Sequence, residues 1–461
     1  MSSIPSTPSK TVSTRRASIP LEPIDTRETA EGFRVPSPKR RKSITSVDGI
    51  VVLPETMAFK PDKIMLAFNG SVSSSCILHW MLELKYEVYC LICDIGQGED
   101  VRTIENRALA IGATKVFVED VKAEFVQSFV LRSIQANAVY DGRLLLGTAL
   151  SRPCIARRQV KLATKEGCQY VAHGAASKTN DAVRFELAYY ALDPTVKVLA
   201  PLRDPRYLET VGRTRAQVLE YAKRNNIEVA NGAELSYNSD LNLFSMQRSG
   251  ALLDDPNRMV STAEIGVGWT TDPEKCPDTA ETVTIEFLKG QPIKALAEGG
   301  RTATDAVGIL SLLNEIGARN GIGRVDMVIN QAVGVKRRVL VDTPGGSLLR
   351  AAHMDLEDLV MDREVRRLRD MMSPKFAELT FNGFWFSPEM EFLCSAVAKS
   401  QEPVEGTVTL RVFKGTAVPV ARNSKVTLGS ESYTTPDDAT GYVHVTAARL
   451  RANAARAKQL K

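Results

Sequence analysis

The sequence has few histidines and no long apolar run, and each scarcity excludes a class of protein. Its 461 residues include four histidines, none at metal-ligand spacing, which argues against a zinc enzyme. No apolar run approaches the roughly 20 residues that span a bilayer. The N-terminal segment has no apolar block, so we expect no secretory signal. With 44% hydrophobic and 25% charged residues, the composition is that of a globular protein with two to three domains.

Cysteine is also sparse. The seven cysteines are an odd number and lie mostly inside apolar runs, which predicts reduced thiols in a cytoplasmic protein. Cys90 and Cys93 have the CxxC spacing, but they lie in a strand-like run that directs the two side chains to different faces. We therefore expect both to be buried packing residues rather than a redox or metal site.

The net charge of +5 is concentrated at the N-terminus. Residues 1–50 hold nine Lys/Arg and five Asp/Glu, so the remainder is nearly neutral, which argues against a nucleic-acid partner. Residues 1–60 are rich in Ser, Thr, Pro and Arg and are predicted to be disordered. Within them, Ser18 and Ser43 follow basic pairs typical of kinase substrates, and Lys39-Arg40-Arg41-Lys42 resembles a nuclear import signal. A solvated charge run is the alternative for each.

Apolar strands alternate with helices over the first half of the globular region. We expect strands at Lys63–Phe68, Tyr86–Asp94, Thr114–Val118 and Tyr170–His173, and helices at Cys76–Lys85, Val101–Ile111 and Val160–Glu166. This alternation predicts an α/β fold with a parallel sheet covered on both faces. The loops 69–75 and 174–181 would leave the carboxyl edge of that sheet, where ligands bind in such folds.

The second half has a mixed pattern, which predicts an α+β domain. We expect strands at Thr282–Leu288, Val325–Ile329 and Gly406–Lys414, and helices at Thr304–Ile316 and Leu356–Met371. The predicted division is a tail at 1–60, a nucleotide-binding-like domain at 61–228, a synthetase-like domain at 229–446 and a helical tail at 447–461. That last tail would lie across a partner subunit or fray in solvent.

The loop 69–75 reads Asn-Gly-Ser-Val-Ser-Ser-Ser and separates a buried strand from an amphipathic helix. This arrangement points backbone N–H groups and a helix N-terminus at the loop, which suits a phosphate group. The loop contains hydroxyls and one glycine but no acidic residue, so we expect no metal site.

Several long motifs resemble argininosuccinate synthase. They are Asp94–Asp100, Gly147–Arg157, His173–Glu186, Met361–Arg366 and Lys375–Leu379. The resemblance implies an N-type ATP-pyrophosphatase domain (adenine nucleotide alpha hydrolase-like) joined to a synthetase/multimerisation domain, usually in a homotetramer. It also implies adenylation of citrulline by ATP with magnesium, followed by displacement of AMP by the amino group of aspartate.

The nucleotide loop departs from the family pattern. Ser73 stands in place of an acidic residue and Ser71 in place of a glycine, which restricts backbone approach to phosphate and removes a charge that helps position the metal. ATP with magnesium is the expected cofactor, with weak or lost binding. The resemblance names these nucleotide-binding candidates: Ala67, Asn69, Gly70, Ser73, Ser74, Ser75 and Gly174.

The substrate positions are changed further. The positions that hold citrulline in the family correspond here to Leu144, Ala149, Asn238, Gln247, Ile329 and Val341. The substrate-binding candidates that remain are Ala176, Asn180, Asp181 and Arg184. An N-cap role is the alternative for Asn180 and Asp181. The motif residues Arg152 and Arg157 keep family positions that we assign to packing and subunit contacts, and we name no catalytic residue.

These changes favour a catalytically impaired or inactive family member with a regulatory or scaffold role. Its expected partners are copies of itself or an active paralogue. The alternative is an active ATP-dependent carbon–nitrogen ligase that joins aspartate to citrulline or to a more apolar acceptor. A nucleotide- or metabolite-sensing module also stays open.

Overall fold

The computed structural model describes residues 61–176, 179–228, 238–261, 268–428 and 440–459. Ser18, Ser43 and the basic run 39–42 lie outside the described residues, so the predictions made for them stay predictions. Within the described residues, no helix is both long and apolar enough to traverse a lipid bilayer.

A five-stranded parallel sheet forms the first half of the described chain, as the alternating pattern predicted. The strand order is β3-β2-β1-β4-β5. The bounds are β1 Lys63–Ala67, β2 Glu87–Asp94, β3 Lys115–Asp120, β4 Tyr170–Ala172 and β5 Lys197–Leu199. The neighbours β1 and β4 pair through Leu66 and Ala172, so the loops that follow them leave the sheet side by side. The prediction that both loops leave the sheet at its carboxyl edge is therefore confirmed.

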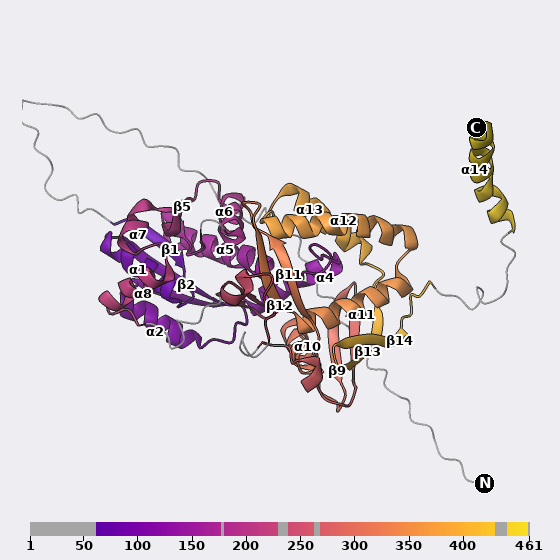
Figure 1. Cartoon of the computed structure of the whole chain (residues 1–461), viewed down its shortest axis with the longest axis horizontal. Helices are drawn as coiled ribbons and strands as arrows, with labels where there is room; N and C mark the ends of the chain where they lie inside the picture. Colours follow the sequence, from indigo (N-terminus) through magenta and orange to yellow (C-terminus); the bar gives the residue numbers. More distant parts are fainter. Residues whose placement is uncertain (1–60, 177–178, 229–237, 262–267, 429–439, 460–461) are drawn as a thin grey trace, which may run out of the picture. The chain divides into compact units, whose positions relative to one another are not determined.

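Helices cover both faces of this sheet (Figure 1). Their bounds are α1 Val72–Glu83, α2 Val101–Ile111, α3 Lys122–Phe125, α4 Leu131–Gln135, α5 Gly147–Glu166, α6 Asn180–Leu192, α7 Pro205–Thr210 and α8 Arg215–Arg224. The chain runs outward through α1 and α2 and returns through α5, and right-handed crossovers then place α5 on the opposite face. Trp80 of α1 packs edge-on against Tyr207 of α7 with ring centroids 5.3 Å apart, within the core on the α1 side.

The second half contains two antiparallel sheets. One has the order β11-β12-β7-β6, with bounds β6 Asn238–Leu241, β7 Met246–Ser249, β11 Arg324–Asn330 and β12 Lys336–Asp342. The other has the order β10-β9-β8-β13-β14, with bounds β8 Glu281–Leu288, β9 Gln291–Ala297, β10 Thr302–Ala303, β13 Gly406–Phe413 and β14 Thr416–Asn423. The mixed α+β pattern predicted for this half is confirmed.

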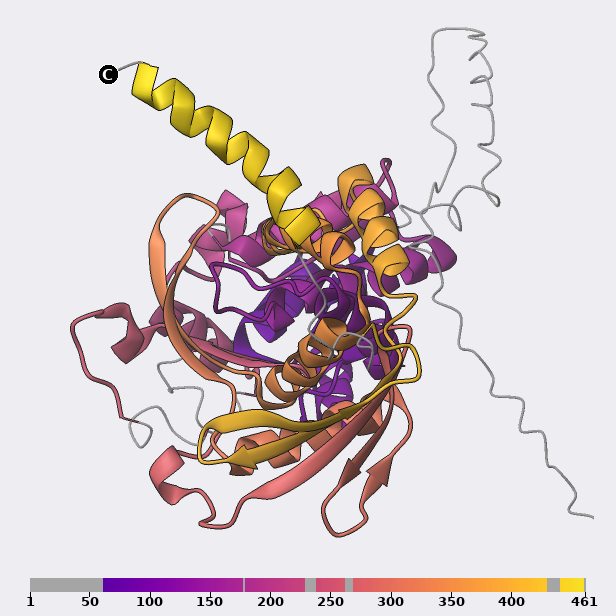
Figure 2. The same cartoon turned by 90° about the vertical axis from the view of Figure 1, so that its right-hand side faces the viewer.

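Helices α10 and α11 pack on the second of these sheets, whose salmon and yellow strands curve around the orange helix in Figure 2. The helices of this half are α10 Ala306–Arg319, α11 Pro344–Val360, α12 Arg363–Asn382, α13 Pro388–Ser400 and α14 Thr440–Gln459. Helix α14 begins before the predicted tail and is exposed along its described residues.

Three predicted helix bounds are wrong. The helix predicted at Leu356–Met371 is two helices, because the Asp362 side chain accepts hydrogen bonds from the backbone N–H groups of Glu364 and Val365 and starts a new helix. Helix α5 begins at Gly147 rather than at Val160, with Pro153 inside it. Helix α1 begins at Val72, because the Ser71 side chain caps it.

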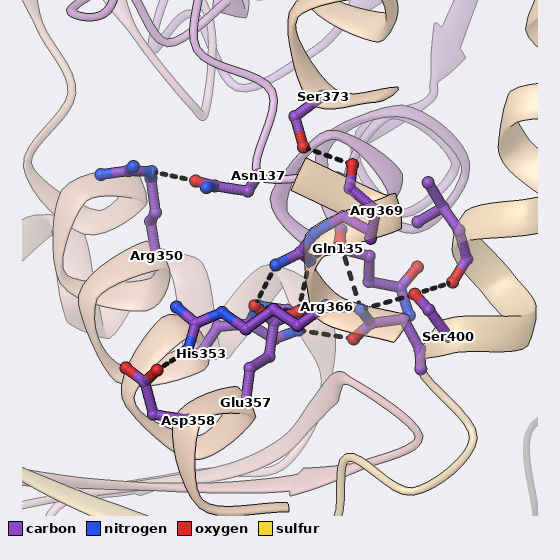
Figure 3. A network of polar contacts seen from close by, with 12 residues as sticks. Gln135, Asn137, Arg350, His353, Glu357, Asp358, Arg366, Arg369, Ser373 and Ser400 are labelled. Atoms are coloured by element: carbon purple, nitrogen blue, oxygen red, sulfur yellow. Dashed lines mark hydrogen bonds and ion pairs between the residues drawn. The ribbon is translucent and has the colours of Figure 1, made fainter. Parts of the chain in front are cut away.

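A buried polar network ties α11, α12 and α13 to the end of α4 (Figure 3). Arg369 binds both carboxylate oxygens of Glu357, and its Nη1 donates to the carbonyl oxygen of Gln135 at 2.7 Å. The Gln401 side chain donates to Glu357 at 2.8 Å, and its carbonyl oxygen lies 2.9 Å from His353 Nε2. These contacts connect helices from both halves of the described chain.

All seven cysteines are free thiols, and all except the partly exposed Cys168 are buried. Burial raises the pKa of Cys90 and Cys93 well above that of an ordinary thiol. The prediction of inert packing residues is therefore confirmed for this CxxC pair.

Candidate active site

A cavity of about 630 Å³ lies between the carboxyl edge of the parallel sheet and the β11-β12-β7-β6 sheet. Its lining includes residues from the β1–α1 loop, the β4–α6 loop, the start of α5 and all four antiparallel strands. Such edges of parallel sheets are where α/β proteins bind their ligands. The cavity is therefore lined by residues that the sequence analysis selected in the β1–α1 and β4–α6 loops, and by residues of the antiparallel sheet opposite them.

One end of the cavity is the β1–α1 loop. The Asn69 side chain accepts from the Ser71 N–H at 3.2 Å, and the Ser71 hydroxyl accepts from the Ser74 N–H at 3.3 Å. Gly70 has a φ of +72°, in the left-handed region that favours glycine, and its carbonyl accepts from Arg107 at 2.6 Å. These bonds hold the loop in one conformation directly before the helix.

The start of helix α1 offers donors to this end of the cavity. Among the described residues, no acceptor binds the N–H groups of Val72 and Ser73, the first two residues of the helix. Helix N-termini carry partial positive charge, and α1 has no acidic residue in its first turn. The buried Ser75 hydroxyl also has no hydrogen-bond partner in the described ranges. The geometry therefore fits a phosphate group.

The β4–α6 loop forms the adjacent wall. His173 is buried, and its Nδ1 accepts from the Ala175 N–H at 3.2 Å while its Nε2 lies 3.2 Å from a Glu186 carboxylate oxygen. A Cβ atom at Gly174 would lie 3.1 Å from the Ile77 side chain, so a larger residue there would press on α1. The loop thus follows α1 closely.

The centre of the cavity holds a cluster of two arginines and two aspartates. Arg152 Nη2 donates to Asp181 at 2.9 Å and to Asp240 at 2.7 Å, and Arg184 Nη1 donates to the other oxygen of Asp181 at 2.9 Å. Arg184 Nε also donates to the carbonyl oxygen of Phe381, and its guanidinium lies 4.9 Å from the centroid of that ring. The charges in this cluster balance.

Burial and charge act in opposite directions on these groups. Burial lowers the pKa of Arg184 below the usual arginine value, although Asp181 opposes this. Burial would raise the pKa of Asp181, but Arg152 and Arg184 outweigh it, so the pKa lies below the ordinary value. Asp181 therefore stays ionised in this cluster, while the buried Asp240 Oδ2 has no hydrogen-bond partner within the part of the chain that the structure describes.

The alternative interpretation made Asn180 the N-cap of α6, and this is wrong. Thr179 occupies that position, and Asn180 is the first residue of the helix. Its side-chain amide donates to the carbonyl oxygen of Asn330 at 3.0 Å and accepts from the Ala332 N–H at 2.5 Å. Asn180 therefore attaches α6 to the β11–β12 hairpin beside the cavity.

The remaining predicted positions also lie around the cavity. The nucleotide candidates that line it are Ala67, Asn69, Ser73, Ser74 and Gly174. Gly70 and Ser75 are buried and are not part of this lining. The substrate candidates Ala176, Asn180, Asp181 and Arg184 line it as well. Of the positions that correspond to citrulline ligands, five line the cavity: Leu144, Ala149, Asn238, Gln247 and Ile329.

Sequence reasoning did not select four charged residues that line the cavity: Glu99, Arg152, Asp240 and Arg337. Arg152 was assigned to packing and subunit contacts, although it lies three residues after Ala149 and thus on the same face of α5. Asp240 and Arg337 lie on antiparallel strands whose register the sequence does not specify. The three-residue spacing from Ala149 could have indicated that Arg152 faces the cavity, but no such spacing applies to the other residues.

The described residues around the cavity do not form a metal-binding cluster of three or more ligands. Across the described ranges, no group of three or more His, Cys, Asp or Glu side chains is arranged to hold a metal ion. The β1–α1 loop has no carboxylate. Magnesium is usually held by one or two carboxylates together with the phosphates of a nucleotide, and it keeps several waters.

Comparison with known proteins gives the family. The Arginosuccinate synthase N-terminal HUP domain matches residues 63–228, and the Arginosuccinate synthase C-terminal domain matches residues 237–458. Argininosuccinate synthase of Pseudothermotoga lettingae is 44% identical over 400 residues, which cover 85% of this chain and 93% of that protein. The proteins of the same name from Danio rerio and Mus musculus are 42% and 41% identical over 397 residues, which cover 84% of this chain and 95% and 96% of those relatives, respectively. The chain belongs to the argininosuccinate synthase family.

Proposed function

We propose that this protein is an ATP-dependent carbon–nitrogen ligase that joins the amino group of aspartate to an acceptor less polar than citrulline. One observation carries this proposal: a single cavity combines a phosphate-suited helix N-terminus, a charged cluster and an apolar wall. The names of the relatives support ligase chemistry more than they support an inactive protein. A role in arginine biosynthesis would follow only if the acceptor were citrulline.

ATP would bind at the β1–α1 end. The N–H groups of Val72 and Ser73 and the hydroxyls of Ser73 and Ser74 would face its phosphates, with Gly70, Ser75 and Gly174 as neighbouring residues of the site. Ala67 and Asn69 would border the nucleotide. The absence of a carboxylate in this loop predicts weaker ATP binding than an acidic loop would give.

The reaction would have two steps. An acceptor oxygen attacks the α-phosphorus of ATP, so that an O–P bond forms and pyrophosphate leaves. The amine of aspartate then attacks the activated carbon, so that a C–N bond forms, the C–O bond to AMP breaks and the nitrogen loses a proton. The protein contributes mainly by positioning the reactants in a site away from water.

Aspartate would bind at the central cluster. Arg152 and Arg184 provide cations for its carboxylates, and the unpartnered Oδ2 of Asp240 provides an acceptor for its amino group. Ala176 and Asn180 would border it from the β4–α6 loop and the start of α6. The acceptor would lie against Leu144, Ala149 and Ile329, which offer no polar side-chain group to a zwitterion.

Aspartate-dependent AMP release tests this function. Purified protein receives ATP with magnesium, aspartate and one acceptor at a time from a panel of ureido and carboxylate compounds that includes citrulline. The proposal predicts AMP release with at least one acceptor less polar than citrulline. No release with any member of the panel would contradict it, and a preference for citrulline would overturn the acceptor assignment.

A second candidate is a catalytically impaired homologue with a regulatory or scaffold role. It is favoured by the serine at position 73 and by the apolar residues where the family resemblance places polar citrulline ligands. The protein would then form homo-oligomers, such as a tetramer, or mixed oligomers with an active paralogue. Co-purification of such a paralogue without AMP release in the assay would support this candidate.

A further inference from the structure

One face of the β11-β12-β7-β6 sheet lines the cavity and carries an arginine among apolar residues. Arg337 on β12 pairs across the strands with Ile329 on β11, so their side chains leave the same face. Val339, two residues along β12, shares that face because strand side chains alternate. All three residues line the cavity. Arg337 thus brings a cation to the wall where the acceptor would lie.

The other two arginines of the cavity are already paired. Arg152 is bound by Asp181 and Asp240, and Arg184 is bound by Asp181 and the carbonyl oxygen of Phe381. Two guanidinium groups and two carboxylates therefore neutralise one another at the centre. Arg337 is not part of this cluster, and Glu99 is a further acidic residue of the lining.

Arg337 has no hydrogen-bond acceptor in the described part of the chain. Its nearest carboxylate is Asp254, with Nε and Oδ1 separated by 3.9 Å, beyond hydrogen-bond distance. The Asp254 side chain is 61% exposed, whereas that of Arg337 is 27% exposed. Exposed ion pairs of this kind contribute little. A half-buried guanidinium of this kind is available to an anion from solution.

We propose that Arg337 binds a carboxylate of the acceptor, which makes the acceptor an acid with an apolar body. This inference rests on the proposed ligase function and names the substrate class of the same site. A carboxylate fits because the planar guanidinium can bind both of its oxygens. The neighbours Ile329 and Val339 would pack against methylene groups of the acceptor.

The same geometry disfavours an α-amino acid at this position. Among the described residues, Asp240 on β6 has a buried carboxylate oxygen without a hydrogen-bond partner, and β6 is separated from β12 by strand β7. Two strand spacings amount to roughly 10 Å. The ammonium and carboxylate groups of an amino acid share one carbon atom, so both cannot reach their partners at once. Asp240 therefore cannot hold the α-ammonium group of an acid that Arg337 binds.

Direct binding measurements test this inference without requiring turnover. The probe is δ-ureidovalerate, which is citrulline without its amino group, and the reference is its neutral primary amide. Each is titrated into the full chain in the presence of ATP and magnesium by calorimetry. The acid should bind about tenfold more tightly than the amide. Arg337→Met should remove that preference, whereas Arg411→Met, at an exposed arginine of β13, should leave it unchanged.

Thermal unfolding of both variants shows that they are folded. Equal affinity for acid and amide, no binding of the acid, or an unchanged preference in Arg337→Met would each overturn the role of Arg337. Acid-selective binding that depends on Arg337 but gives no AMP release would contradict the ligase function and leave the inference standing. AMP release with the amide as readily as with the acid would overturn the role of Arg337 and leave the ligase function standing.

Discussion

Two charged clusters of this protein use the same groups with opposite consequences. At the junction of α4, α11, α12 and α13, Arg369 and Glu357 are 1% and 0% exposed, and Gln401 and the Gln135 carbonyl oxygen complete their hydrogen bonds. In the cavity, Arg152 and Asp240 are 13% and 26% exposed, and Asp240 keeps an unpartnered oxygen. The closed cluster fixes the packing of four helices, whereas the open one has binding capacity left for a ligand.

The largest effect should follow from breaking the closed cluster. Arg369→Met leaves the Glu357 carboxylate buried without its cation, and such a loss costs about 3–5 kcal/mol. We expect a decrease of this size in the free energy of unfolding, measured with urea at neutral pH. The double variant Arg369→Met with Glu357→Leu should regain most of it, because no uncompensated charge remains. A single variant as stable as wild type would refute the structural role.

The open cluster should respond less in stability and more in binding. Asp181→Asn removes the carboxylate shared by Arg152 and Arg184, at a cost of about 1–3 kcal/mol in the free energy of unfolding. We expect aspartate-dependent AMP release to decrease at least about tenfold, equivalent to ~1.4 kcal/mol. Asp240→Asn, which loses a single arginine contact, is the matched control and should destabilise less. An Asp181→Asn protein with normal AMP release would contradict the assignment.

The closed cluster should also give the protein an acid-sensitive stability. Burial lowers the pKa of His353, with Arg369 acting in the same direction and Glu357 and Gln401 opposing. Burial opposes ionisation of Glu357, but His353, Arg369 and Gln401 outweigh it and lower its pKa. In both cases the unfolded chain takes up the proton first as the pH falls.

Stability should therefore decrease below about pH 6.5, and again below about pH 4.3, with at most ~1.4 kcal/mol lost per pH unit for each proton. Urea denaturation at a series of pH values measures this. His353→Gln should flatten the first decrease and leave the second. A wild-type stability that rises on acidification through this range would contradict the sign.

The smallest effect is expected at the β1–α1 loop. Ser73→Asp places a carboxylate at the second residue of α1, where the helix dipole should stabilise the protein by about 0.3–1 kcal/mol. We expect AMP release to change by less than about tenfold, because Ser74, Ser75 and the free N–H groups remain. If the wild type released no AMP and Ser73→Asp did release it, the result would instead favour the impaired homologue.

The sequence predicted the parallel sheet well, because its strands are continuous apolar runs separated by turn residues. It also placed loops 69–75 and 174–181 at the same edge of the sheet, and the structure adds that the strands before them, β1 and β4, are adjacent. The break between α11 and α12 was missed because Asp362 caps a helix inside an otherwise helical pattern. The role of Asn180 was missed because its partners lie about 150 residues away, on the β11–β12 hairpin.

The residues that would contact the acceptor, Arg337, Ile329 and Val339, show a second limit of sequence reasoning. Whether Arg337 faces the cavity depends on the register of β12 with β11 and β7, which tertiary packing fixes. A shift of one residue would turn Arg337 away and Arg338 toward the cavity. The family resemblance located most of the cavity positions, but their chemistry depends on pairings that only the structure provides.

The most direct test is a competition that reads the product by mass. The protein is incubated with ATP, magnesium and aspartate together with equal amounts of citrulline and δ-ureidovalerate, and the aspartate adducts are quantified by mass spectrometry. This account predicts that the δ-ureidovalerate adduct predominates and that Arg337→Met abolishes its excess. Argininosuccinate as the main product, or the absence of both adducts, would contradict it.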